Sequence, residues 1–101
     1  TSGGTDHAWS GNCFLTGGSV KGGQILGKYP DISEGSPLNI DRGRIIPSYP
    51  WESLWSPIAL FLGVGSIHMN VVLPNLLMFL DDQILKFKTV FKSNCTDYEK
   101  C

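Results

Sequence analysis

The large apolar side chains of this 101-residue chain are concentrated in its second half. Residues 1–50 hold most of the 12 glycines and few apolar runs, whereas residues 51–91 hold most of the large side chains. A glycine-rich segment loses much backbone entropy on folding and gives little packing in return. A chain this short builds a stable core only when its whole length contributes to it. We therefore expect a piece of a larger structure, not an independent complete domain.

The charge and the ends of the chain indicate no particular partner. A net charge of -1 gives no electrostatic reason to expect nucleic acid or an anionic membrane surface as a partner. No Met, basic leader or apolar signal stretch precedes Thr1, so we expect the chain to begin inside a longer polypeptide. Its apolar runs are too short and too interrupted to span a bilayer, so we expect no transmembrane segment.

The three cysteines favour an extracytoplasmic or secreted location. Cys95 and Cys101 lie on either side of a short polar loop, where a local disulfide is sterically feasible. Cys13 lies in an apolar run and is left over, so a free buried thiol is the simplest interpretation. Asn94 opens an Asn-Cys-Thr sequence that fits the N-glycosylation acceptor pattern. Disulfides and glycans both belong to proteins outside the cytoplasm.

Short apolar segments in the first half are typical of strands. Residues 12–16, closed by a pair of glycines, predict a short buried strand. Gly22 and Gly23 mark a tight turn or a close backbone approach before the apolar segment 24–27. From Lys28 to Pro50 the composition shifts to Pro, Ser, Asp and Gly, which predicts an irregular connection along the surface.

The clearest helix is predicted from residue 50 to residue 62. Large apolar side chains recur there at helical spacing, namely Trp51, Leu54, Trp55, Ile58, Phe61 and Leu62. Pro50 fits the first turn and Gly63 is well placed to end the helix. Pro57 removes one backbone hydrogen bond and is expected to kink the helix or delay its start. We expect the apolar stripe to pack in a core rather than to form an aromatic binding platform.

A second amphipathic helix is predicted from Pro74 or Asn75 to Ser93. Its apolar residues recur at helical spacing, namely Leu77, Leu80, Ile84, Phe87 and Phe91. Its lysines occupy the remaining surface of the helix, namely Lys86, Lys88 and Lys92. Asp81 and Asp82 near its middle are expected on a solvated face rather than as a metal pair.

Asp6 and His7 form the one pair with metal chemistry. Asp and neutral His are both ligands for zinc and other divalent ions, and the neighbouring glycines let adjacent side chains converge. A catalytic metal site takes at least three protein ligands, and the only other histidine is the distant His68. From the residues alone, a hydrogen-bonded turn is therefore the stronger interpretation.

The glycine-rich stretch that follows is a candidate anion-contacting loop. Backbone N–H groups in such a stretch can surround an anion, and Gly17, Gly18 and Lys21 are the residues placed to do so. The stretch matches neither a P-loop, because it lacks the Gly-Lys-Ser/Thr ending, nor the spaced glycines of a dinucleotide fingerprint.

Five motifs together resemble the C-terminal part of the family called domain of unknown function fifteen-oh-one. In chain order they span residues 4–9, 14–27, 42–47, 62–64 and 72–75, so that the match from the first motif to the last extends over most of the chain. Proteins of that family are mostly secreted and are similar to the alkaline phosphatase and sulfatase superfamily.

The resemblance implies an α/β fold, namely the C-terminal fragment of an alkaline-phosphatase-like sandwich with short strands, glycine-rich loops and two amphipathic helices. Residues 1–65 would form the superfamily-like segment with the helix 50–62, and residues 66–101 a helical extension with a cysteine-containing tail. By the same analogy His7 is a metal ligand and Asp6 a ligand or an orienting residue. The metal would be zinc or calcium, and the implied chemistry is two-metal-assisted hydrolysis of a phosphate or sulfate ester in the complete parent protein.

The chain also departs from that superfamily. It contains no Ser/Thr nucleophile motif, no N-terminal metal-binding strand and no further metal ligands, because the resemblance covers only the last part of such a domain, so we expect no hydrolase activity from this chain alone. It is then either the C-terminal part of a secreted ester hydrolase or a non-catalytic structural or interaction subunit of a larger assembly. An independent glycine-rich binding module is least favoured. The partners are the remainder of the parent polypeptide or other protein subunits.

Overall fold

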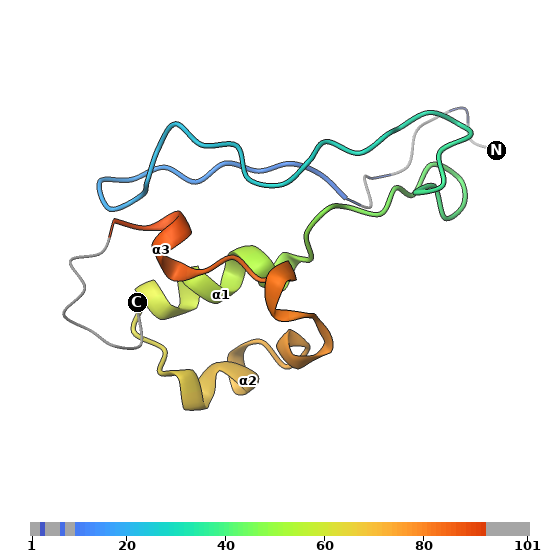
Figure 1. Ribbon diagram of the computed structural model, residues 1–101. Coiled ribbons are helices and arrows are strands. Elements are labelled where there is room, and N and C mark those ends of the chain that lie inside the picture. The colour runs from blue at the N-terminus through green and yellow to red at the C-terminus, as the bar shows by residue number, and fades with distance from the viewer. Residues whose placement is uncertain (1–2, 4–6, 8–9, 93–101) are drawn as a thin grey trace. The chain divides into compact units, whose positions relative to one another are not determined.

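The computed structural model describes residues 3, 7 and 10–92, and its chain divides into two compact units (Figure 1). The first unit comprises residues 1–14 and 27–48, and the second comprises residues 15–26 and 49–101. The two units are defined by which residues contact one another, and this does not test the boundary at residue 65 that the family resemblance implies. That boundary stays a prediction.

The α/β sandwich expected from the sequence is wrong, because the described residues contain helices and no strand. In chain order the elements are α1 (Trp51–Phe61), η1 (Ser66–His68), α2 (Met69–Val72), η2 (Leu76–Met78), η3 (Asp81–Gln83) and α3 (Phe87–Val90). Within the described residues, extended backbone pairs only in two isolated antiparallel bridges, Val20 with Phe91 and Asn39 with Ile45.

The buried strand expected at residues 12–16 is absent. Phe14 is 91% exposed and Cys13 is an exposed free thiol, so the expectation of a buried cysteine is wrong as well. A single short strand is not stable without neighbouring strands or a helix to pack on. The surrounding glycine-rich sequence supplies neither, and an apolar run alone does not create them.

Helix α1 lies where the first helix is expected, and both of its ends follow from local sequence signals. Pro50 precedes it with extended backbone, and the helix begins at Trp51, so Pro57 does not delay its start. At the other end Gly63 has a φ of +89°. Its N–H donates to the Leu60 carbonyl and the next N–H donates to the Ala59 carbonyl, both at 3.0 Å. These two bonds form a Schellman motif, which ends a helix at a left-handed glycine.

The most deeply buried side of α1 is not the expected one, although Ile58 and Phe61 of the expected stripe do contact the core. Its buried residues are all small or cyclic, namely Ser53, Ser56, Pro57 and Ala59. In contrast, Trp51, Trp55 and Leu62 are 57%, 48% and 75% exposed, and their spacing of four and seven positions places them on one side of the helix. We call these three residues the α1 apolar face. The expectation that they pack in a core is therefore wrong.

Ser53 explains why the small side chains point inward. It is completely buried, and its Oγ accepts a hydrogen bond from the Leu85 N–H at 3.1 Å. A small side chain lets the neighbouring backbone come close enough for this bond, whereas a tryptophan at the same place would keep the two segments apart. The segment before α3 is thereby attached directly to α1.

The core of the second unit is built around α3, which lies beside α1 (Figure 1). Its buried residues are Phe87, Val90 and Phe91, and Val20, Ile58, Leu60 and Leu85 pack against them. The rings of Phe61 and Phe91 are stacked with centroids 4.5 Å apart and planes 10° apart, and the Phe87 ring lies 5.1 Å from that of Phe91. Aromatic contacts of this kind add to the stabilisation that comes from burial alone.

The second long helix expected up to residue 93 is wrong for the described residues. They form the short turns η2 and η3 and the short helix α3 instead. Leu80 has extended backbone, and its N–H donates to the side-chain Oε1 of Gln83 at 2.9 Å. Polar side chains that bond nearby backbone offer an alternative to a continuous helix. The apolar spacing of this segment therefore did not produce one.

The first unit is irregular, and its best-defined part is the turn in residues 39–45. Arg42 and Gly43, at the centre of the turn, both have positive φ, +55° and +79°. Positive φ at two adjacent residues is what the tight turns between antiparallel segments need. Such a conformation is rare for an arginine, so the surrounding contacts must hold it.

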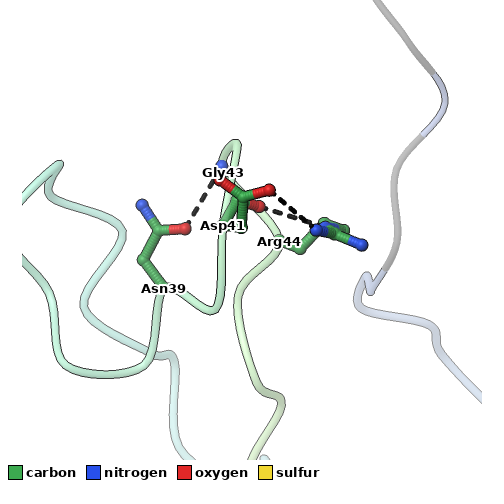
Figure 2. A network of polar contacts seen from close by, with 4 residues as sticks. All are labelled: Asn39, Asp41, Gly43 and Arg44. Atoms are coloured by element: carbon green, nitrogen blue, oxygen red, sulfur yellow. Dashed lines mark hydrogen bonds and ion pairs between the residues drawn. The ribbon is translucent and has the colours of Figure 1, made fainter.

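Side chains on either side of this turn hold it closed (Figure 2). Asn39 Oδ1 accepts a hydrogen bond from the Gly43 N–H at 3.2 Å, and the Asp41 carboxylate lies 3.1 Å from the Arg44 guanidinium. Both charged side chains are about half exposed or more. Exposed ion pairs contribute only about 0–1 kcal/mol, so these contacts shape the turn more than they stabilise the unit.

We expect Gly63→Ala to lower the free energy of unfolding by about 1 kcal/mol, because an added Cβ strains left-handed backbone even where no other atom is near. The matched control is Gly22→Ala, where the backbone is not left-handed and the added Cβ also meets open space. It should change the free energy by less than about 0.5 kcal/mol. Urea unfolding followed by circular dichroism measures both, and equal losses would contradict the assigned role of Gly63.

Ser53→Ala should lower the free energy of unfolding by about 2 kcal/mol, because the partly buried Leu85 N–H loses its acceptor. Ser48→Ala is the control, since Ser48 Oγ accepts the Lys28 N–H at 3.0 Å at an exposed site where water can replace it. Its loss should stay below about 0.5 kcal/mol. Similar small losses for both variants, measured by urea unfolding, would show that the Ser53 bond does not hold the unit together.

Candidate functional site

Only one member of the predicted metal pair is described. His7 is exposed, and Asp6 lies outside the described residues. Among the residues that the structure does describe, no three His, Cys, Asp or Glu side chains are grouped closely enough to hold a metal ion. Because a catalytic site takes about three protein ligands, the described donor set does not fit a zinc or calcium centre. The metal therefore stays a prediction from the family resemblance.

The predicted disulfide and glycosylation site cannot be placed. Cys95, Cys101 and Asn94 lie outside the described residues. Their pairing and modification stay predictions, as does the extracytoplasmic location that depends on them.

The predicted anion-contacting loop is attached to the end of α3 by backbone hydrogen bonds. The Lys21 N–H donates to the Val90 carbonyl at 2.9 Å, and the Lys92 N–H donates to the Ser19 carbonyl at 2.8 Å. Between these bonds lies the bridge of Val20. The N–H of Lys21 is therefore engaged inside the chain, and an anion at this loop would meet its side-chain ammonium group instead.

Two lysine side chains bond backbone carbonyls where the loop meets α3. Lys92 Nζ donates to the Gly18 carbonyl at 3.0 Å, and Lys21 Nζ donates to the carbonyl of Lys88. All three lysines are exposed. We call Lys21, Lys88 and Lys92 the lysine patch. The structure thus joins the predicted Gly18 and Lys21 to Lys92 and Lys88, for which the sequence pattern predicts only a place on the polar face of a helix.

A compositional signal for the lysine patch was present in the sequence. Residues 15–26 and 84–92 contain four lysines and no aspartate or glutamate, in a chain whose net charge is -1. The fourth, Lys86, pairs with Asp81 at 2.6 Å. The sequence does not predict the bridge between Val20 and Phe91, which brings the loop of Lys21 to the end of α3.

Apolar side chains cover much of the remaining surface of the second unit. In addition to the α1 apolar face, the side chains that are more than half exposed include Ile67, Val71, Val72, Leu77, Met78 and Leu80. A groove of about 270 Å³ lies among the residues of η1, α2 and η2 and is lined by Ser66, Ile67, Met69, Asn70, Leu76 and Leu77. It contains no titratable side chain, so it offers contact surface and no acid–base chemistry.

Comparison with models of known protein families found no matching family, and comparisons with curated proteins and with solved structures found no match. The resemblance given above therefore stays an expectation from the sequence. Among the described residues, no helix combines the length and the apolar character needed to cross a membrane.

Among the described residues of the first unit, Asp31 has a carboxyl group whose pKa is shifted. Asp31 Oδ1 accepts a hydrogen bond from the Ser33 N–H at 2.9 Å. This bond and a second one from the Ser33 side chain lower the pKa of Asp31 below its ordinary value, because both favour the charged carboxylate. The carboxylate is fully exposed and acts as a local turn stabiliser, with no catalytic neighbour among the described residues.

Ser33→Ala should raise the pKa of Asp31 towards the ordinary value of about 3.9, because it removes the side-chain bond and leaves the backbone bond. A lowered pKa in the folded state stabilises the turn above about pH 4, and this contribution disappears as the pH falls through the folded pKa. NMR titration of the Asp31 carboxyl carbon measures the shift, with Asp41 as reference in the same spectra. An unchanged Asp31 pKa in the variant would contradict the role of Ser33.

Proposed function

We propose that this chain is a non-catalytic structural or interaction segment of a larger assembly, and that the α1 apolar face is covered there by protein. The proposal rests on one observation: the two tryptophans of α1 and Leu62 at its C-terminal end are exposed, while its serines are buried. Single exposed apolar residues are ordinary in soluble proteins, but a contiguous exposed patch is a feature of interaction surfaces.

The composition of the α1 apolar face supports this function. Tryptophan is enriched among the residues that dominate the energy of protein interfaces. Each large aromatic side chain carries about 150–250 Å² of surface that can be removed from water. Two of them, one turn apart on a helix whose other side is already attached to α3, form a rigid surface that needs little reorganisation to bind.

The ester hydrolase interpretation is supported by the family resemblance alone. It predicts further Asp and His metal ligands upstream of residue 1 in the native polypeptide, and the interaction interpretation predicts none. Intact mass and peptide mapping of the native polypeptide separate the two. If upstream ligand motifs are present, the next measurements are the metal content of the native polypeptide and its activity on phosphate and sulfate esters.

The proposal predicts that Trp51→Gln/Trp55→Gln changes the free energy of unfolding of the isolated chain by less than about 1 kcal/mol, because neither side chain contributes to the core. The contrasting variant is Phe87→Ala, which should lose about 3–5 kcal/mol because that ring belongs to the buried cluster. A loss of several kcal/mol in the tryptophan variant would show that the α1 apolar face is used inside the chain, which would contradict the proposal.

The same variant should separate folding from assembly. In the native source the polypeptide that contains this chain should elute as a particle larger than its own mass, and the double tryptophan variant should elute at the mass of the free polypeptide. Size-exclusion chromatography with light scattering measures both. A wild-type chain that elutes alone from its native source would also contradict the proposal.

A further inference from the structure

The apolar groove of the second unit has room for one aromatic side chain. It lies among η1, α2 and η2, and its volume is about 270 Å³. An apolar cavity of about 150 Å³ binds benzene, so an indole, with half as many ring atoms again, needs about 225 Å³ on the same scale. Pockets for drug-sized ligands begin at about 300 Å³. The groove therefore fits one tryptophan side chain better than a larger small molecule.

The residues that line the groove suit an indole. Met69 is buried there, whereas Ile67 and Leu77 are 79% and 84% exposed. Methionine is flexible and polarizable, so it adapts its shape to an aromatic ring. Asn70 also lines the groove, and its side-chain carbonyl is a hydrogen-bond acceptor of the kind that a buried indole N–H requires. The groove thus offers both the apolar contacts and the polar group that a tryptophan uses at an interface.

Side chains that match the groove are present on the same chain. Trp51 and Trp55 are exposed, so neither indole occupies the groove of its own copy. Helix α1 is held in this orientation by the buried Ser53, whose Oγ accepts the Leu85 N–H, and turning the tryptophans inward would break that bond. The groove that remains within reach of these tryptophans is that of a second copy.

The apolar area of the two surfaces is close to what a stable contact needs. The exposed parts of the two indoles and of Leu62 amount to about 350 Å². On the groove, Ile67, Leu77 and Val71, which follows Ile67 by four positions along η1 and α2, expose about 250 Å². The smallest stable interfaces bury about 1,200 Å² in total, of which about 680 Å² is apolar. We therefore expect a reversible contact that depends on concentration.

We propose that the groove receives a tryptophan from the α1 apolar face of a second copy of this chain, so that copies associate head to tail. The inference rests on the proposed function above and names the protein that covers the α1 apolar face. Two different surfaces form the contact, so each pair of copies still has one free apolar face and one free groove. Further copies add to these until a ring closes.

The test measures the mass of the full chain by size-exclusion chromatography with light scattering at increasing concentration. The mean mass of the wild type should rise to more than about twice that of one copy, because association continues past a pair. Trp51→Gln/Trp55→Gln and Leu77→Glu should each stay at the mass of one copy, because each lacks one of the two surfaces. The matched control is Ile25→Glu, the same change at a 97% exposed residue that lies in neither surface, and it should associate as the wild type does.

Mixing the two deficient variants tests the head-to-tail geometry directly. The Leu77→Glu chain keeps its tryptophans and the double tryptophan variant keeps its groove. An equimolar mixture should therefore form a particle of about twice the mass of one copy and nothing larger. Leu77 is exposed, so its variant should unfold at the same urea concentration as the wild type. Ile67→Glu, at a second exposed residue of the groove, should behave in the same way.

Two outcomes would overturn the inference. Association of Leu77→Glu and Ile67→Glu equal to that of the wild type would show that the groove takes no part. A wild-type chain that stays at the mass of one copy at every concentration, while the native polypeptide elutes in a larger particle, would show that a different protein covers the α1 apolar face. The proposed function would then stand. Absence of self-association together with a native polypeptide that elutes alone would remove both proposals.

Discussion

The second unit depends on the packing of Phe91. This residue is only 3% exposed. Its ring stacks on Phe61 of α1, and its backbone pairs with Val20 from a segment some seventy positions earlier in the chain. One residue therefore joins three segments that no local signal brings together. The burial of its ring stabilises the packing of these segments, and the backbone bridge fixes the register in which the glycine-rich loop lies against α3.

The sequence predicted those features of the second unit that depend on nearest neighbours. Helix α1 follows from apolar spacing and from Gly63, whose left-handed backbone ends the helix. The spacing did not predict which side of α1 is buried. It separates an apolar side from a side of small residues, and the packing of the core determines which of the two faces inward. Here Ser53 is buried because the backbone at Leu85 must approach α1, and that need is not written in the sequence of the helix.

Where the sequence misled, a local polar contact or a missing neighbour explains why. The bond from the Leu80 N–H to Gln83 starts a new turn within a segment whose apolar spacing predicts one long helix. Residues 12–16 have the composition of a strand and nothing to pair with. The lysine patch could not be derived from spacing, because it depends on the distant bridge at Val20. In the first unit, Ile45 is the one buried large apolar side chain among the described residues, as a glycine-rich composition leads one to expect.

The exposed tryptophans and the buried serines of α1 have one physical origin. The space beside α1 is already filled by the rings of Phe87 and Phe91, and a protein interior at normal packing density has no room for two indoles in addition. The helix satisfies this constraint by turning its small side chains inward, where Ser53 also supplies an acceptor for a backbone N–H. The tryptophans are then outside because the core is complete without them. A surface of this kind is unfavourable in water and is stabilised by association.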